Sequence, residues 1–463
     1  MPKTSEASKR LRLRLRLRIR TRLVKNKYAP APRSILVPFV STHRPKRSLA
    51  RRQPSTSRPH KSPHTLAKPF EPDLARAVDL VMQMMAIPGS SGQESKIAEF
   101  IIARLVNAGV SRTSIKYDSA HRRSPLTGQI GNMVLKLAGT SRGPRRMLTA
   151  HLDTVPICVG SVPCRRGNIV RSTAPGRGLG ADNRAGCAVL LSALLEIFDR
   201  DLPHPPLTFC WFVQEEIGLQ GARAANRSLW GKPRLAFNWD GGAPTKLTIG
   251  ATGGYRTEIN INGIAGHAGN APEKGVSAIA IASLAIADLH QNGWHGDVRK
   301  GTQHGTSNVG IIRGGDATNV VTQHVYVKAE ARSHDAKFRK KILTEIENSF
   351  RRAAKAVRNV EGKAGRVSIA SELDYESFLL PSDEPCVRVA QTAVRAVGGD
   401  PQLAVANGGL DANWMTAHGI PTVSLGCGQK NQHMESETLD IARFALACRV
   451  GLRLATGTEE TRV

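Results

Sequence analysis

Apolar and polar positions follow two periods along the chain, that of a helix and that of a strand. Helical spacing from Leu74 to Met85, and again in SGQESKIAEFIIARLVNAG, predicts two amphipathic helices. Ser91 and Glu94 have the spacing of a capping box before the second helix, and Gly109 is placed as its C′ glycine. We predict strands in NMVLKLAG, RRMLTAHLDTV, LTFCWFVQEE and RLAFNWDGG and a helix in DNRAGCAVLLSALLEIF. Such alternation indicates an α/β domain with a largely buried sheet.

The pattern changes near Ala251. TGGYRTEINING alternates like a half-exposed strand, and EKGVSAIAIASLAIADLH has the spacing of a helix. Two strands, TSNVGIIRGG and ATNVVTQHVYVKAEARS, and the charged helix DAKFRKKILTEIENSFRRAAKAV complete a β-α-β-β-α block. The α/β pattern returns after about residue 365, with a buried strand in PTVSLGCG and a final helix from about Glu437. We predict one α/β domain, residues 71–250 and 365–463, interrupted by an inserted α+β sandwich, residues 251–364.

The first 70 residues differ in composition from the rest. They hold 20 Lys or Arg and a single acid, Glu6, and so carry 19 of the formal net charge of +29. This Pro-, Ser- and Arg-rich segment cannot bury enough apolar surface to offset its ordering entropy, and we expect a disordered extension. Three interpretations stay open: a targeting segment, a basic arm for nucleic acid or an anionic surface, or sequence from a wrongly assigned start codon.

Cysteine usage and apolar run lengths bear on the compartment. The seven cysteines are an odd number without paired spacing, and none forms a C-x-x-C pair. This favours reduced thiols in a cytoplasmic protein over a disulfide framework or a thiolate zinc site. No apolar run reaches the ~18 residues that a membrane helix needs, so no membrane span is expected.

Acidic and imidazole side chains recur where the predicted strands end. MLTAHLDTV places His151 and Asp153 two residues apart, hence on one face of a strand. Asp182 lies in the glycine-rich turn GLGADNRAG, Asp240 ends the strand FNWDGG, and His433 lies in GQKNQHMESE. Singly, each has a structural explanation as a core histidine, a helix cap or a turn. Their common place at the strand ends of one sheet indicates a ligand site.

FVQEEIG adds two adjacent carboxylates, Glu215 and Glu216, after an apolar strand. A solvated strand end is the ordinary explanation for such a pair. Neighbouring strand residues point to opposite sides, so we expect the two glutamates to have different roles. Acids and imidazoles gathered this closely need a cation to offset their repulsion. Two histidines and three carboxylates suit Zn²⁺, Mn²⁺ or Co²⁺, and one bridging carboxylate would allow two metals about 3.5–4 Å apart.

The series HLDTV, GADNRAG, QEEIGLQG, NWDGG and NQHMESE resembles the dizinc aminoacylase and carboxypeptidase family of metallopeptidases. The motifs GIAGHAGNAPEKGVSA, NVGIIRGGDATNVV and EARSHD look most like its peptidase T branch. The resemblance covers about residues 74–455. It implies a mixed-sheet zinc-exopeptidase catalytic domain with an inserted lid and dimerisation domain.

The resemblance also implies the ligands of two Zn²⁺ ions, with Co²⁺ or Mn²⁺ as possible substitutes. His151 and Asp240 match terminal ligands, one on each side together with Glu216 and His433. Asp182 matches the carboxylate that bridges the two metals.

Five further roles follow from the same motifs. Asp153 matches an acid that orients a metal-bound imidazole, and Glu215 matches the general base. His267 and Arg332, on the lid, match residues that stabilise the oxyanion and hold the substrate carboxylate. Asn319 matches a lid side chain near the substrate.

We expect a peptidase T-like aminopeptidase that cleaves short peptides through a dizinc-activated water, with a possible homodimer through the lid. A carboxypeptidase or an N-acyl amino acid deacylase would use the same chemistry, because specificity depends on lid contacts. A hypothesis of another class is a non-enzymatic binding protein that uses residues 1–70 to contact nucleic acid.

Overall fold

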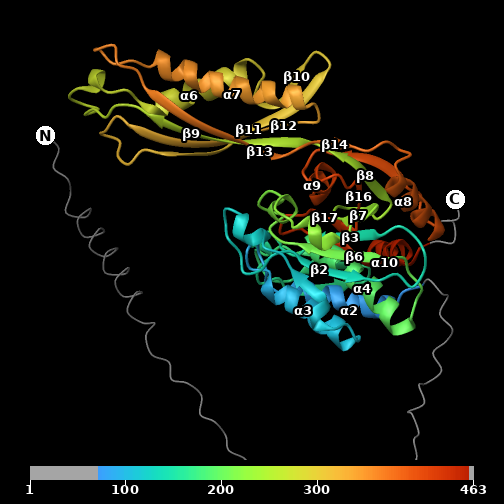
Figure 1. Cartoon of the computed structure of the whole chain (residues 1–463). Helices are drawn as coiled ribbons and strands as arrows, with labels where there is room; N and C mark the ends of the chain where they lie inside the picture. Colours follow the sequence, from blue (N-terminus) through green and yellow to red (C-terminus); the bar gives the residue numbers. More distant parts are fainter. Residues whose placement is uncertain (1–70, 458–463) are drawn as a thin grey trace, which may run out of the picture. The chain divides into compact units, whose positions relative to one another are not determined.

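A mixed nine-stranded sheet forms the centre of the α/β part of the computed structural model, which describes residues 71–457 (Figure 1). The strand order is β1-β2-β6-β3-β7-β16-β8-β14, with β15 paired to β8. Strands β6, β3, β7 and β16 run parallel, whereas β2 and β8 are antiparallel to their neighbours β6 and β16. The bounds are β1 Ile115–Tyr117, β2 Met133–Leu137, β3 Arg146–His151, β6 Leu207–Phe212, β7 Leu235–Trp239, β8 Lys246–Ala251, β14 Phe378–Leu379, β15 Gln402–Ala406 and β16 Thr422–Leu425.

Helices cover this sheet, and a small second sheet accompanies it. The small sheet has the order β17-β18-β5-β4. Helices α2, α4 and α10 pack against one another, and α4 contacts β3 and β7. The bounds are α2 Leu74–Ala86, α3 Ser95–Asn107, α4 Ala181–Arg200, α5 Gln220–Arg223, α8 Pro385–Ala396, α9 Asp411–Ala417, α10 Ile441–Thr456, β4 Pro163–Arg166, β5 Ile169–Ser172, β17 Gln429–Lys430 and β18 Thr438–Asp440.

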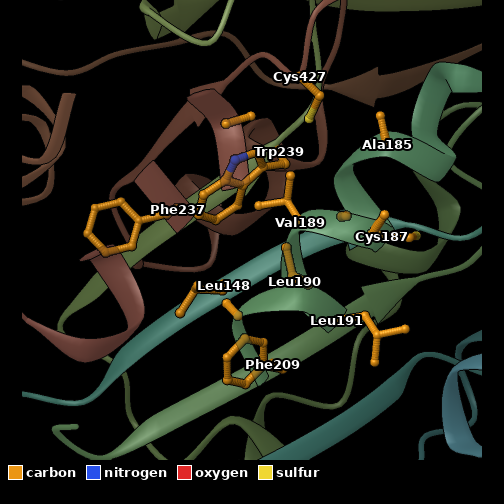
Figure 2. Packing of buried hydrophobic residues seen from close by; sticks show 14 of the residues in the cluster. Leu148, Ala185, Cys187, Val189, Leu190, Leu191, Phe209, Phe237, Trp239 and Cys427 are labelled. Atoms are coloured by element: carbon orange, nitrogen blue, oxygen red, sulfur yellow. The ribbon is translucent and has the colours of Figure 1, made fainter. Parts of the chain in front are cut away.

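The main core lies between α4 and the parallel strands. Figure 2 shows Val189 and Leu190 of α4 together with Leu148 of β3, Phe209 of β6 and Trp239 of β7, all fully buried. Each large apolar side chain buried in this way contributes roughly 1.5–3 kcal/mol. Every residue of β3, β6 and β7 is buried, as expected for a sheet covered on both faces. The predicted α/β class is therefore confirmed.

The ends of the predicted elements follow the sequence signals only in part. Gly109 has a φ of +97° just after α3, as the C′ position requires. The predicted capping box is wrong, because Glu94 is itself the N-cap and no side chain caps the helix. The Ser91 hydroxyl donates instead to Asp153, 2.7 Å away. The final helix begins at Ile441, with Asp440 as its cap, and not near Glu437.

A five-stranded antiparallel sheet with two helices forms the inserted part (Figure 1). Its order is β10-β11-β12-β9-β13, and α6 and α7 pack on it over a separate apolar core. Alternate residues of β9 and β12, such as Ile259 and Val327, are buried in that core. The bounds are β9 Gly253–Asn262, α6 Ala278–Gln291, β10 Gly296–Lys300, β11 Gln303–Gly314, β12 His324–Ser333, α7 Ala336–Ala356 and β13 Arg366–Tyr375.

This sheet has more strands than the predicted β-α-β-β-α block. β10 was missed, and β13 pairs with β9 along its whole length. The sheet therefore continues to Tyr375, beyond the predicted end of the inserted domain at residue 364. β12 begins at His324, later than the predicted start near Ala317. The domain division at residues 250/251 and 364/365 stays a prediction.

Two predictions about the whole chain can be checked on residues 71–457. The seven cysteines all lie in this range and are free. No helix of this range is long and apolar enough to cross a membrane. The predictions for residues 1–70 lie outside the described residues.

Candidate metal centre

Six of the predicted site residues lie in one cluster. Three groups each place one ligand atom per residue within 4.8 Å of the others. The groups are His151 with Glu215 and Glu216, His151 with Asp182 and Asp240, and Asp182 with Glu216 and His433. Asp182 belongs to one group with each histidine: its Oδ1 lies 3.3 Å from Nε2 of His151 and its Oδ2 lies 3.6 Å from Nε2 of His433.

The parallel strands explain why these side chains meet. β3, β6 and β7 are neighbours, so their carboxyl ends lie at one edge of the sheet. His151 is the last residue of β3, and Asp240 follows β7 directly. Asp182 enters from the start of α4, where Gly180 has a φ of +79° and is the N-cap. Asp182 therefore does not cap the helix, and its carboxylate faces the histidines.

Asp153 connects this strand edge to the glutamates. It is fully buried, and its carboxylate accepts hydrogen bonds from the Ser91 hydroxyl and from the amides of Glu215 and Glu216. Oδ1 of Asp153 also lies 3.4 Å from Nδ1 of His151. Burial alone would raise the pKa of Asp153, but the contacts with His151 and Ser91 outweigh it and lower that pKa. Asp153 thus orients the imidazole through its carboxylate and through its backbone carbonyl, which lies 3.1 Å from Nδ1 of His151.

Glu215 and Glu216 do not lie on a strand. β6 ends at Phe212, and Gln214 has a φ of +56°, so the chain has already turned before the two glutamates. The alternation expected of a strand is therefore wrong for these two residues. Oε2 of Glu216 lies 2.9 Å from Nε2 of His433, whereas Glu215 groups with His151. Glu216 is thus grouped with both histidines, whereas Glu215 is grouped with His151 alone, and it is the turn, not the pleat of a strand, that sets the two carboxylates apart.

The electrostatics of the cluster show how much negative charge is concentrated there. Burial and the neighbouring Asp182 raise the pKa of Asp240 to about 7, and burial likewise raises the pKa of Glu216 to about 7. Burial raises the pKa of Glu215 well above its usual value. Hydrogen bonds that the His433 ring donates to the carboxylates of Asp182 and Glu216 raise the pKa of His433 to about 10. In the metal-free chain the cluster retains protons that it would release to a cation.

The residues present fit a divalent metal. Oε1 of Glu216 is buried and lacks a hydrogen-bond partner among the described residues, and Oδ1 of Asp182 is buried with no hydrogen bond beyond its 3.3 Å contact with Nε2 of His151. A buried carboxylate oxygen without a partner is costly, and a cation is the usual compensation. Imidazole nitrogens and carboxylate oxygens in this proportion are ligands for Zn²⁺, Mn²⁺ or Co²⁺.

Two acids near the cluster were not predicted. Glu437 accepts hydrogen bonds from the amides of Gly180 and Asp182, and so holds the turn that presents Asp182. It lies in the quoted motif NQHMESE, where only the histidine was singled out. Asp411, the first residue of α9, is fully buried, and neither carboxylate oxygen has a hydrogen-bond partner among the described residues. The glycine pair before it, in NGGLDANW, was the only signal.

The three predicted substrate residues lie on the inserted part. His267 and Asn319 are exposed and adjacent, since the Ala268 amide donates to the Asn319 carbonyl over 2.9 Å. Arg332, in β12, is half-buried and donates to Glu330 over 2.9 Å. Within residues 71–457, no hydrogen bond or ion pair joins these three residues to the cluster.

Comparisons with known proteins agree with the motifs. The model of the peptidase dimerisation domain matches residues 249–358, and that of peptidase family M28 matches residues 132–269. The uncharacterized protein YqjE of Bacillus subtilis is 29% identical over 79% of this chain and 94% of its own length. A peptidase T of Vibrio cholerae is 27% identical over 60% of this chain, and the alignment spans 65% of that protein.

A solved structure extends the likeness to the whole fold. The crystal structure of a tripeptidase from Staphylococcus aureus matches with a TM-score of 0.74 and 28% identity, over 83% of this chain and 98% of that one. An α/β sheet with an inserted dimerisation domain and a carboxylate–imidazole cluster is the architecture of a metal-dependent peptidase. The chain is thus similar to peptidase T-like members of the M20 family of peptidases, and this likeness confirms the resemblance drawn from its motifs.

Proposed function

We propose that this peptidase is an aminopeptidase that removes the first residue of tripeptides and other short peptides, with two divalent metal ions in its site. The observation that carries the proposal is the shared position of Asp182, whose Oδ1 lies near His151 and whose Oδ2 lies near His433. A carboxylate so placed is suited to bridge two cations. The likeness to a tripeptidase and to a peptidase T supports the choice of substrate.

The proposed ligands fall into two overlapping sets. His151, Asp182 and Asp240 would hold one ion, and Asp182, Glu216 and His433 the other. When bound, two such ions lower the pKa of a water between them and polarise the scissile carbonyl. We expect Zn²⁺ as the physiological metal, with Co²⁺ or Mn²⁺ as substitutes.

Glu215 is the proposed general base. Its amide is fixed on Asp153, and its carboxylate is buried beside His151, Asp240 and Glu216. A carboxylate with a raised pKa is a better proton acceptor near neutral pH. Glu215 would take a proton from the attacking water and return it to the leaving amine.

His267 is the proposed donor to the oxyanion. Its Nδ1 accepts hydrogen bonds from the amides of Gly269 and Asn270, each over 3.1 Å. A neutral imidazole that accepts at Nδ1 carries its proton on Nε2, so Nε2 is a donor. Arg332 would hold the peptide carboxylate, ideally in a bidentate pair, and Asn319 would contact the substrate beside His267. These residues would reach the reacting bond from the lid of the same subunit or of a second one in a homodimer.

The two nearest alternatives use the same metals and base. A carboxypeptidase or an N-acyl amino acid deacylase also has a substrate carboxylate for Arg332 to bind. A free α-amino group on the substrate distinguishes the aminopeptidase, and the substrate panel below separates the three activities. We place the enzyme in the cytoplasm, because its seven cysteines are free thiols.

The test is hydrolysis by the metal-free protein after addition of Zn²⁺, Co²⁺ or Mn²⁺. The substrates are tripeptides with free and acetylated N-termini, together with N-acetyl and N-succinyl amino acids. We expect release of the first residue from free tripeptides only, and only with metal. Cleavage of N-acyl amino acids, or release of the last residue, would replace the proposed specificity. Full turnover in protein shown by elemental analysis to be metal-free would overturn the metal mechanism.

A further inference from the structure

An ion pair of the inserted sheet lies beside the turn that carries the two glutamates. Nε of Arg256, in β9, lies 2.8 Å from Oδ2 of Asp374, in β13. The Asp374 side chain is only 4% exposed, whereas that of Arg256 is 35% exposed. The Asp374 carboxylate is therefore enclosed by protein, whereas the Arg256 side chain that pairs with it stays partly exposed to solvent.

A β-bulge aims Asp374 at this place. In the register of β13 with β9, Leu373 faces Tyr255 and Tyr375 faces Gly254, which leaves Asp374 as the extra residue. A bulge interrupts the alternation of side chains and redirects one of them, and bulges are frequent beside active sites. Without the bulge, strict alternation would continue and the Asp374 side chain would not be redirected in this way.

The pair contacts the glutamate turn directly. Nη1 of Arg256 donates to the Ile217 carbonyl over 3.4 Å. A Cβ added to Gly218 would lie 2.7 Å from Oδ1 of Asp374, and Gly218 has a φ of +108°. Both the close approach and the backbone conformation require glycine at this position. The glycine of the motif QEEIGLQG thus has its partner on the inserted sheet.

The same turn is fixed from the other side by the catalytic sheet. The amides of Glu215 and Glu216 donate to Asp153, and the amides of Gly218 and Leu219 return to the Glu215 carbonyl over 2.9 and 2.8 Å. The turn is therefore held between Asp153 and the Arg256–Asp374 pair. Loss of either support would leave the glutamate carboxylates free to shift.

We propose that Arg256 and Asp374 are positioning residues, which hold the Glu215–Glu216 turn in register with the metal centre from the inserted domain. The proposal rests on the proposed roles of Glu215 as base and Glu216 as ligand. Neither positioning residue need touch the substrate. Misplacement of a catalytic group by about 1 Å can cost on the order of 100-fold in rate, so the pair would act mainly on kcat.

The experiment compares Asp374→Asn, Arg256→Gln, Arg256→Lys and the double variant Arg256→Gln/Asp374→Asn in the metal-loaded, full-length enzyme. The matched control is Lys328→Gln, which breaks the pair between Lys328 and Glu258 on the same sheet, 2.9 Å apart. We expect each neutral variant to lower kcat by roughly 10- to 100-fold with KM little changed. The double variant should be no worse than the worse single one, because both remove one support. Arg256→Lys should recover part of the loss, and Lys328→Gln should match the wild type.

A second measurement does not depend on turnover. Hydrogen exchange at the amides of Gly218 and Leu219, both bonded to the Glu215 carbonyl, should be faster in Asp374→Asn and unchanged in Lys328→Gln. If the wild type hydrolyses peptides but the Arg256 and Asp374 variants show unchanged exchange and unchanged kcat, the positioning role is overturned and the proposed function stands. An inactive metal-loaded wild type would instead overturn the proposed function, and faster exchange in Asp374→Asn than in the wild type would still support the contact.

Discussion

The backbone amide of Glu215 donates a hydrogen bond of 3.0 Å to Oδ1 of Asp153. One buried carboxylate therefore orients the His151 ring and also fixes the start of the glutamate turn. Both functions depend on the negative charge of Asp153, which the neighbouring imidazole and hydroxyl stabilise. The position of the proposed base is thus coupled to that of a proposed metal ligand through a single side chain.

The two glutamates should respond differently to the same substitution. Glu215→Gln keeps the shape of the side chain but removes the proton acceptor, so we expect normal metal content and a kcat lowered by at least ~10²–10⁴-fold. Glu216→Gln changes a proposed metal ligand that lies close to His433, so metal affinity should fall and excess metal should restore part of the activity. The measurements are metal stoichiometry and kcat for both variants in parallel. Loss of metal from Glu215→Gln with retention in Glu216→Gln would reverse the two assignments.

Local patterns predicted much of this fold, and contacts between distant residues account for most of what was missed. The strands that lead to His151 and Asp240 were predicted correctly, because each is a short apolar run typical of a buried strand. The alternation of Val367, Ile369 and Leu373 in β13 is that of a strand, but alternation does not name the partner, which is β9, more than a hundred residues earlier. The Ser91–Glu94 capping box failed for the same reason, because the Glu94 carboxylate accepts from the distant Gln214 amide.

For the candidate site, too, local motifs predicted some features, whereas others depend on contacts that only the fold shows. Motifs placed the cluster residues at strand ends, and the structure brings six of them together. The turn at Glu215 could not be inferred, since the apolar run gives no sign that the strand ends at Phe212. Asp411 was missed because an aspartate after two glycines is ordinarily a solvated turn residue, and only the fold shows its burial.

Metal binding should depend strongly on pH. The pKa values of Asp240 and Glu216 are raised to about 7 in the metal-free chain, so these groups stabilise the fold below their ordinary pKa values, and this stabilisation is lost as pH rises through 7. The pKa of His433 is raised from 6.5 to about 10, so protonated His433 also stabilises the fold, and this contribution decreases as the pH rises above 6.5. Metal ions bind the deprotonated carboxylates and remove the repulsion. We expect the difference in melting temperature between the Zn²⁺-loaded and the chelated protein to widen by several degrees from pH 5.5 to 8. A constant or shrinking difference would contradict this electrostatic account.

Arg184 should be essential for stability. Its guanidinium is fully buried and donates to the carbonyls of Leu152, Ile87 and Gly89, at the edge that carries the metal centre. Arg184→Met keeps much of the volume and removes every donor, so the carbonyls of Leu152, Ile87 and Gly89 each lose a hydrogen bond. We expect the free energy of unfolding to fall by roughly 3 kcal/mol or more, measured by urea denaturation of the metal-free protein. Arg112→Met, which breaks an exposed pair with Glu99, is the control and should leave the unfolding curve nearly unchanged. Equal effects of the two substitutions would contradict the role of the buried hydrogen bonds.

His267 tests whether two subunits share one site. The resemblance to the dizinc metallopeptidases implies a lid histidine that reaches the site of the partner subunit. If the same holds here, a mixture of the inactive variants His267→Ala and Glu215→Ala should regain a clear fraction of wild-type activity as heterodimers form. Subunit exchange is checked by native mass spectrometry, and a mixture of wild type with Glu215→Ala serves as the reference. Verified exchange without any recovery would place the histidine in the site of its own chain.

The strand order of the main sheet has a consequence for synthesis of the chain on the ribosome. β16, Thr422–Leu425, is inserted between β7 and β8, although it follows them by well over a hundred residues. A nascent chain that has emerged as far as β8 therefore has a gap at the centre of its sheet, and His433 has not yet been made. The proposed metal centre can assemble only when almost the entire chain has left the exit tunnel, whereas the inserted sandwich, whose strands are contiguous in sequence, can fold before it.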